Sequence, residues 1–321
     1  MRLENIVRLL VAAFLLLPVT GHAQEAYPNR PITFVVPAAA GGGIDRLARL
    51  LADKLRAKWN QTIIIENRGG AGGAIGTTHV AGAAPDGYTL LFAAAGHIAI
   101  DRGIKLSYDP EGWTPVSLLT VAPNVLVVNS NVKAHSVQEF VALAKAKTGG
   151  LTYASQGIGT TMHLSVEWLR DLAAVQMVHV PYGGGGPAMT DLLGGQVDAM
   201  FTEPSSILPN IRTGALRPLA VGSEKRDAML PDVPAMSEIY PGFVSMAWQA
   251  VVAPQGTPKD IAQKLSDAFA EALRQPDVAA SLRNSSLNAV GSSPEALATF
   301  IKEERVRWHA VIAKANIKFQ Q

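Results

Sequence analysis

The sequence of 321 residues contains no cysteine. This absence excludes disulfide bonds, cysteine-ligated metal sites and catalysis by a thiolate. It does not exclude secretion, because an oxidising compartment permits disulfide bonds without requiring them, and a chain of this size does not need them for stability. A single core stops growing near about 250 to 300 residues, so the length favours two lobes.

Long hydrophobic runs are also missing, except near the first residue. Arg2 and Arg8 precede an apolar run, Leu9 to Leu17, and a Gly-His-Ala sequence then ends at Ala23. A permanent bilayer span needs about 20 apolar residues, and this run is shorter. Basic, apolar and small residues in this order are typical of a secretory signal peptide, whereas an uncleaved N-terminal helix is the alternative. We therefore predict cleavage after Ala23 and a periplasmic mature protein.

The sequence has no excess of charge of either sign. Removing Arg2, Arg8 and Glu4 of the predicted leader from 28 basic and 26 acidic residues leaves a formal balance of +1. Binding to nucleic-acid phosphates needs clustered lysine and arginine. The charge balance therefore argues against nucleic acid as a partner.

Sequence signatures of common catalytic sites are absent. The histidines show no HExxH pair and no metal-ligand spacing, and no glycine-rich loop ends in Gly-Lys-Ser or Gly-Lys-Thr. Residues 70–75 lack the last glycine of a dinucleotide-binding fingerprint, and Ser155 lacks the leading glycine of a nucleophile elbow. We expect no enzymatic activity, no metal and no cofactor. A secreted serine hydrolase that uses Ser155 with His163 or His179 is the catalytic alternative.

Glycine is abundant, and it lies between short apolar strands and helices. Ile32 to Pro37 predicts a buried strand, followed by a glycine loop and a helix with leucines at helical spacing. The same order returns at Ile63 to Ile65, Leu151 to Ala154 and Met177 to Pro181. Strands that alternate with helices favour an α/β fold with mostly parallel sheets, and two clusters, before and after about Val128, indicate two lobes. Ligands bind such sheets at the carboxyl ends of the strands, so we expect the site in the cleft between the lobes.

Four loops place glycine, serine or threonine directly before a helix. A helix N-terminus presents unpaired N–H groups and a partial positive charge, which hold a carboxylate or phosphate without lysine or arginine. In any single loop the glycines can instead serve only to make a tight turn. Four such loops together favour anion capture by the backbone. The loops are residues 41–43, 69–76, 155–161 and 183–186.

Short segments spread along the mature chain form a more specific pattern. They are Tyr27-Pro28, Gly41-Gly42 with Asp45, Glu66-Asn67-Arg68 with the glycines after it, Pro85 to Leu91, Tyr108-Asp109-Pro110, Ser155 to Thr160, Val180-Pro181-Tyr182 and Asp191 to Asp198. Together these segments resemble the Bug-type substrate-binding proteins of tripartite tricarboxylate transporters. The resemblance covers essentially the whole mature chain.

The resemblance implies a Venus-flytrap fold of the type II periplasmic binding class, in which the second lobe is inserted into the first. Lobe 1 would comprise residues 24–127 and 250–321, and lobe 2 would comprise residues 128–249. The two hinge strands would lie near Leu126 to Asn129 and Ala247 to Val251.

The resemblance also implies a small carboxylate ligand that is delivered to the membrane subunits of such a transporter. Tricarboxylates, dicarboxylates, amino acids and aromatic acids stay open, because Thr202 stands where family members often have an acidic residue. A sensory subunit for a signalling partner is the other non-catalytic alternative. We expect a monomer, since no apolar stripe is left over. The predicted ligand-binding residues are Ala39, Ala40, Gly41, Gly42, Asp45, Gly72, Gly73, Ser155, Gly157, Gly159, Thr160, Thr161, His163, Tyr182, Gly183, Gly184 and Thr202.

Overall fold

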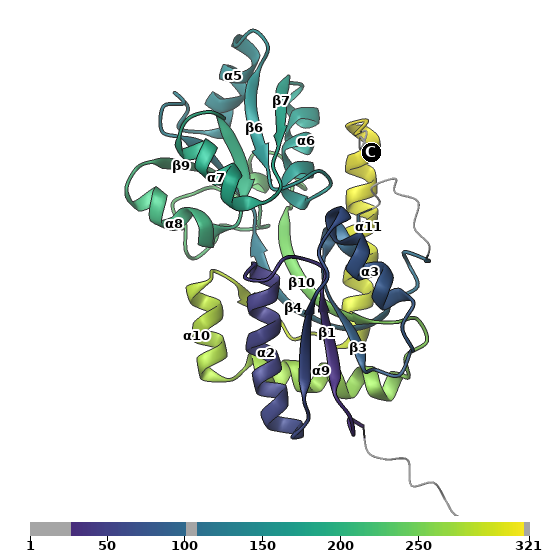
Figure 1. Cartoon of the computed structure of the whole chain (residues 1–321). Helices are drawn as coiled ribbons and strands as arrows, with labels where there is room; N and C mark the ends of the chain where they lie inside the picture. The colour runs from purple at the N-terminus through teal and green to yellow at the C-terminus, as the bar shows by residue number, and fades with distance from the viewer. Residues whose placement is uncertain (1–26, 101–107, 318–321) are drawn as a thin grey trace, which may run out of the picture.

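The computed structural model describes residues 27–100 and 108–317, so the predicted signal peptide lies outside the described residues. The described chain forms two β-sheets with helices packed against them, and the sheets belong to two lobes, one above the other in Figure 1. The predicted two-lobed α/β architecture is present. Among the described residues, no helix combines the length and the apolar character of a transmembrane span.

The sheet of lobe 1 is mixed. Its strands are β1 (Ile32–Val36), β2 (Ile63–Asn67), β3 (Thr89–Ala94), β4 (Thr114–Pro123), β10 (Met246–Ala253) and β11 (Asn288–Ala289). They lie in the order β11-β4-β10-β3-β1-β2. Strand β1 pairs in parallel with β2 and β3, whereas β10 runs antiparallel to β3 and β4. The carboxyl ends of the three parallel strands therefore meet at one edge.

Helices cover both faces of this sheet. They are α2 (Gly43–Trp59), α3 (Ala74–Ala81), α4 (Ala95–Ile98), α9 (Lys259–Leu273), α10 (Pro276–Asn284) and α11 (Pro294–Lys314), with a short 3-10 helix η1 (Ala71–Gly73). Phe34 of β1 packs with Phe92 and Phe269 in the core under α2 and α9, whereas its neighbour Val35 faces the core that contains Trp308 of α11. Because both faces are buried, β1 needs an apolar residue at nearly every position.

The sheet of lobe 2 has the same two-faced construction. Its strands are β5 (Val125–Asn129), β6 (Leu151–Ser155), β7 (Met177–Pro181), β8 (Ala199–Thr202) and β9 (Leu216–Val221), in the order β7-β6-β8-β5-β9. Its helices are α5 (Val137–Ala146), α6 (Thr161–Ala173), α7 (Gly185–Leu193) and α8 (Pro204–Arg212), with a 3-10 helix η2 (Met236–Glu238). Helices α5 and α6 pack into one core, and α7 and α8 pack into the other.

The chain passes between the sheets twice, at Asn124 and over residues 222–245. Backbone hydrogen bonds tie the two passages together. The amide of Asn124 donates to the carbonyl of Ser245 at 3.0 Å, and the amides of Gly222 and Ser245 donate to the carbonyls of Asn124 and Gly222 at 2.6 and 2.8 Å. The passages therefore lie side by side.

The expected hinge segments, 126–129 and 247–251, lie inside β5 and β10 rather than between the sheets. In each case the change of sheet comes a few residues earlier in the chain. We therefore move the proposed lobe boundaries to Asn124 and to the residues before Met246. The physical reason is that β4 and β5 follow each other with one residue between them, so hydropathy alone marks no boundary there.

Helix α11 also links the lobes, along the side where it is drawn in yellow in Figure 1. It packs against β4 of lobe 1 and α6 of lobe 2. Trp308 on α11 meets Trp168 on α6 edge to face, with ring centroids 6.3 Å apart. Glu304 accepts hydrogen bonds from the indole nitrogens of Trp308 and Trp248 at 2.9 and 2.8 Å. The lobes thus share a packed contact besides the two chain passages.

Candidate ligand-binding cleft

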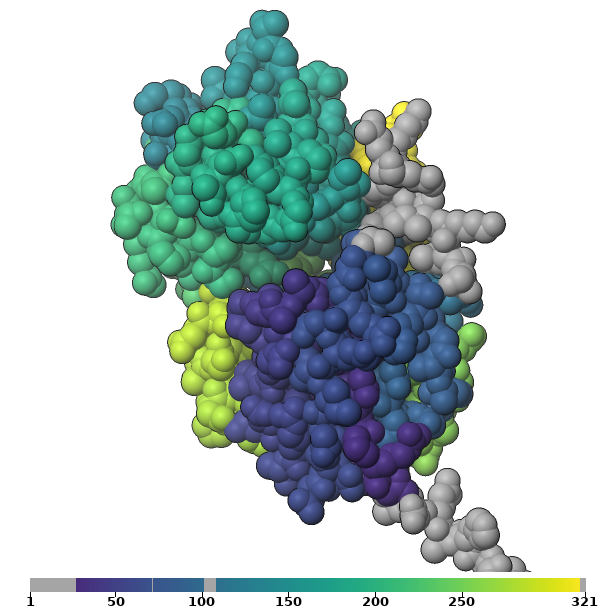
Figure 2. All heavy atoms as spheres, in the orientation of Figure 1, coloured from purple at the N-terminus to yellow at the C-terminus, as the bar shows by residue number. Residues whose placement is uncertain are grey.

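A cleft of ≈ 820 Å³ lies between the two lobes. Figure 2 shows the molecular surface hollowed along the line where the teal and green lobe meets the blue one. Lobe 2 and two parts of lobe 1, its loops and its strand β10, contribute to the lining. The lining segments are residues 43–44, 72 and 94–97 of lobe 1, residues 156–162, 181–183 and 203 of lobe 2, and residues 247–249 of β10.

Five helices of eight or more residues begin at or beside this cleft, among them α3 at Ala74, two residues after the lining residue Gly72, and α8 at Pro204, directly after the lining residue Glu203. Helix α2 begins at Gly43 and α6 at Thr161, which both line the cleft, and α7 begins at Gly185, two residues after the lining residue Gly183. The N-caps of α2 and α7 are glycines without a side-chain capping bond. Their first-turn N–H groups therefore remain available to oxygen atoms of a ligand, and the helix dipoles favour a negative charge there.

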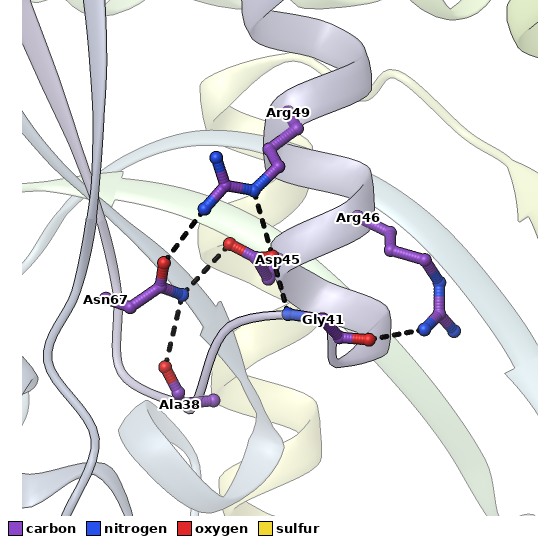
Figure 3. A network of polar contacts seen from close by, with 6 residues as sticks. All are labelled: Ala38, Gly41, Asp45, Arg46, Arg49 and Asn67. Atoms are coloured by element: carbon purple, nitrogen blue, oxygen red, sulfur yellow. Dashed lines mark hydrogen bonds and ion pairs between the residues drawn. The ribbon is translucent and has the colours of Figure 1, made fainter.

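The loop before α2 is held by a buried carboxylate, which Figure 3 shows from close by. Asp45 accepts hydrogen bonds from the amide of Gly41 at 2.8 Å, from Nε of Arg49 at 3.0 Å and from Nδ2 of Asn67 at 2.9 Å. Nδ2 of Asn67 also donates to the carbonyl of Ala38 at 3.2 Å. Asp45 thus fixes the backbone that leads into the helix instead of lining the cleft.

The charge of Asp45 is stabilised in place. Burial raises the pKa of this carboxyl, but hydrogen bonds from Arg49, Gly41 and Asn67 outweigh it and lower the pKa to about 2. The group is therefore ionised throughout the neutral range. An anion in the cleft would repel a carboxylate that faced it. The carboxylate of Asp45 is instead paired with donors behind the loop, which is compatible with an anion site in front of it.

One contact matches the alternative of a serine hydrolase. Oγ of Ser155 lies 2.7 Å from Nε2 of His179. However, Ser155 is 0 % exposed, and a nucleophile must reach its substrate. The ring of His179 is nearly parallel to the rings of Tyr153 and His163, with centroids 4.8 and 4.2 Å away. Burial lowers the pKa of His179, and burial with the neighbouring His179 lowers the pKa of His163 to about 4. Because His163 is the third residue of α6, these ring contacts help to position the start of that helix.

The predicted site residues divide into three groups. Those that line the cleft are Gly72, Gly157, Gly159, Thr160, Thr161, Tyr182 and Gly183. Those that are buried behind its wall and hold the loops are Asp45, Ser155, His163 and Thr202. Those that stand in the same loops without lining the cleft are Ala39, Ala40, Gly41, Gly42, Gly73 and Gly184.

Two segments that line the cleft were not predicted from the sequence. Residues 94–97 follow the carboxyl end of β3, a position where the rule for α/β sheets places ligand loops, but they form no glycine cluster. Residues 247–249 belong to β10, and a tryptophan in an apolar strand such as Trp248 is typical of a core residue. It is 2 % exposed and also borders the cleft. Glu203, which is not among the predicted site residues, lines the cleft as well.

Known proteins resemble this chain over nearly its whole length. The family model described as "Tripartite tricarboxylate transporter family receptor" matches residues 47–317. Protein BugT of Bordetella pertussis is 37% identical over 330 residues, which cover 98% of this chain and 100% of BugT.

Solved structures match in three dimensions. Rpa4515 of R. palustris, solved with adipate, has a TM-score of 0.82 at 33% identity, over 91% of this chain and 99% of that one. MatC from Rhodopseudomonas palustris, solved with bound malate, has a TM-score of 0.79 at 36% identity, over 89% of this chain and 100% of that one. These matches confirm the predicted fold class.

Proposed function

Because this chain belongs to the family of tripartite tricarboxylate transporter receptors, whose members are substrate-binding proteins and not enzymes, we propose that it captures a small carboxylate between its lobes. The observation that carries the proposal is the meeting of the first turns of α2 and α6 at one cleft, with α7 beside them. Adipate in Rpa4515 and malate in MatC support a ligand of this chemical class.

The magnitudes fit capture by the backbone. A hydrogen bond to a charged group contributes about 1.5 to 3 kcal/mol, and micromolar binding requires about 8 kcal/mol. Four or five such bonds reach about that value after the cost of ordering the ligand and the loops. No lysine or arginine lines the cleft among the described residues, so the ligand charge would be met by N–H groups and helix dipoles.

We further propose that the first 23 residues are a cleaved leader, that the mature protein is periplasmic, and that it delivers its ligand to two membrane subunits. Capture for a signalling partner would use the same cleft. Cross-linking in membranes of the native host, followed by identification of the captured protein, distinguishes the two, because transporter subunits and a signalling receptor are different partners.

A charge placed at the start of α2 tests the binding site directly. Gly43 has a backbone conformation that other residues adopt, and a Cβ there would lie 3.8 Å from Nε2 of Gln249, an ordinary contact. In Gly43→Asp the new carboxylate occupies the helix N-terminus, so we expect a folded protein that has lost ligand binding. The measurement is the rise in melting temperature with a panel of mono-, di- and tricarboxylates.

The matched control is Gly43→Asn, which has nearly the same size and no charge, and it should keep most of the ligand-induced rise. Native mass spectrometry of the gently purified wild type adds a readout that needs no guess about the ligand. If no carboxylate in the panel stabilises the wild type and none co-purifies with it, the proposed function is wrong.

A further inference from the structure

Glu203 is the one acidic side chain that lines the cleft among the described residues. It follows β8 as the N-cap of α8, where its backbone carbonyl accepts hydrogen bonds from the amide and hydroxyl of Ser206 at 3.2 and 2.8 Å. Its carboxylate accepts no hydrogen bond from the described residues. This side chain therefore differs from Asp45, whose donors are all supplied by the fold.

The carboxylate of Glu203 is in an unfavourable position for a charge. Burial raises its pKa, and Arg46 on α2 offsets this only in part. The guanidinium of Arg46 donates to the carbonyl of Gly41 at 2.5 Å, and among the described residues its interaction with Glu203 is a longer-range attraction without a hydrogen bond. Glu203 is half-buried and has no hydrogen-bond or ion-pair partner among the described residues, so its position at the cleft favours a cationic partner.

We propose that Glu203 selects ligands that carry a protonated amine as well as a carboxylate, an inference that rests on the proposed function. The first turns of α2 and α6 hold the carboxylate, and Glu203, on a separate element, pairs with the ammonium group. A dicarboxylate would instead present its second anion to the Glu203 carboxylate, and like charges repel in a water-poor site. The preferred ligand class is therefore a small amino acid or another aminocarboxylate.

Three pairs of probes that differ only in the amino group test this selection. They are aspartate with succinate, glutamate with glutarate, and 4-aminobutyrate with butyrate. Isothermal titration of the mature wild-type protein should give a lower Kd for the amino member of at least one pair. A charge-assisted bond contributes about 1.5 to 3 kcal/mol, which corresponds to a preference of about tenfold to a hundredfold.

Glu203→Gln keeps the size of the side chain and removes its charge. Because the side chain makes no capping bond to α8, the variant should fold like the wild type, with an unchanged far-ultraviolet spectrum. We expect it to weaken binding of the amino member by about tenfold or more, and to leave its partner unchanged or slightly tighter. Asp171→Asn is the control, because this carboxyl is exposed on α6 and lies outside the cleft lining, and it should leave the ratio of the two Kd values unchanged.

The outcomes separate this inference from the proposed function. If the wild type binds carboxylates but prefers the members without an amino group, or if Glu203→Gln leaves the ratio unchanged, the selection by Glu203 is wrong and carboxylate capture stands. If Glu203→Gln and Arg46→Gln weaken the binding of all ligands equally, the attraction between Glu203 and Arg46 holds the two lobes together and does not select the ligand. That result also overturns the selection. If no probe and no other carboxylate binds, both proposals fall.

Discussion

At the scale of single residues, Asp45 serves the cleft without facing it. The sequence places an acidic residue beside Gly41 and Gly42, which predicted a ligand contact. The structure instead gives the carboxylate three donors behind the loop, from Gly41, Arg49 and Asn67. Its function is to position the first turn of α2, and spacing along the sequence could not reveal which way the side chain is oriented.

We expect Asp45→Asn to lower the free energy of unfolding by about 2 to 4 kcal/mol, because an amide cannot accept from all three donors at once. Urea denaturation measures this loss. Asp53→Asn on the same helix is the control, since the Asp53 side chain is 70% exposed, and it should cost less than about 0.5 kcal/mol. Equal effects of the two variants would contradict the anchoring role.

The stabilisation that Asp45 provides should depend on pH in a defined way. The pKa of Asp45 is lowered in the folded state from 3.8 to about 2, so its contribution is complete above the unfolded value and is lost as pH falls toward the folded value. The difference in unfolding free energy between wild type and Asp45→Asn should therefore be constant at neutral pH and shrink between about pH 4 and pH 2. Urea titrations at several pH values check this, and a difference that grows with acid would contradict it.

At the scale of elements, the strand, loop and helix units were predictable where both hydropathy and glycine marked them. Strand β4 was not predicted, although it is a ten-residue strand. It carries Ser117 and Thr120 at buried positions, and register shifts interrupt its pairing with β10. Its neighbours β10 and β11 lie more than a hundred residues away in sequence, and they determine its burial. No pattern within residues 114–123 therefore predicts the strand.

Helix starts were also predicted unevenly. A threonine directly before a proline predicts a helix cap at Thr257, but Pro258 is the N-cap of α9, and the hydroxyl of Thr257 donates to the carbonyl of Pro254 at 2.8 Å. The glycine-rich loop at residues 69–76 predicts that the next helix begins at Thr77, but α3 begins at Ala74, because Gly72 and Gly73 adopt left-handed backbone angles and turn the chain into the helix. Both differences arise from backbone geometry that the residue types alone leave open.

The cap of α6 allows a matched comparison between elements. The hydroxyl of Thr160 accepts from the amide of His163 at 3.3 Å and donates to the carbonyl of Gly157 at 2.9 Å, so it joins the helix to the cleft loop. Ser136 accepts from the amide of Glu139 at 3.1 Å at the start of α5, outside the cleft lining.

We expect Thr160→Ala and Ser136→Ala each to cost about 1 kcal/mol of stability, the usual value of an N-cap. Only Thr160→Ala should also weaken ligand affinity, by up to about tenfold, because it frees the loop that the ligand must then order. Thermal unfolding and titration with the carboxylate found in the panel measure the two effects. A loss of affinity in Ser136→Ala as large as in Thr160→Ala would show that stability, not loop position, sets affinity.

At the scale of the whole molecule, the two-lobed plan was predictable and the full cleft was not. Residues 94–97 and 247–249 join the lining because β3 and β10 are neighbours in the sheet of lobe 1, although they are far apart in sequence. The cleft is bounded by both lobes, which are joined by the two passages near Asn124 and by the packing of α11 on α6. If the proposed ligand capture closes the lobes, we expect a hinge rotation about this joined side.

The absence of cysteine makes the rotation measurable, because two introduced cysteines are the only thiols available for spin labels. Ala57 on α2 and Lys145 on α5 are exposed and stand in different lobes, whereas Lys145 and Asp171 on α6 are exposed in the same lobe. A saturating ligand contacts both lobes only when they close, so we expect it to shift the Ala57→Cys/Lys145→Cys distance toward shorter values and to leave the Lys145→Cys/Asp171→Cys distance unchanged. Pulsed electron resonance measures both. Unchanged distances in both pairs, with binding confirmed in the same samples, would mean that the ligand enters a preformed site without lobe closure.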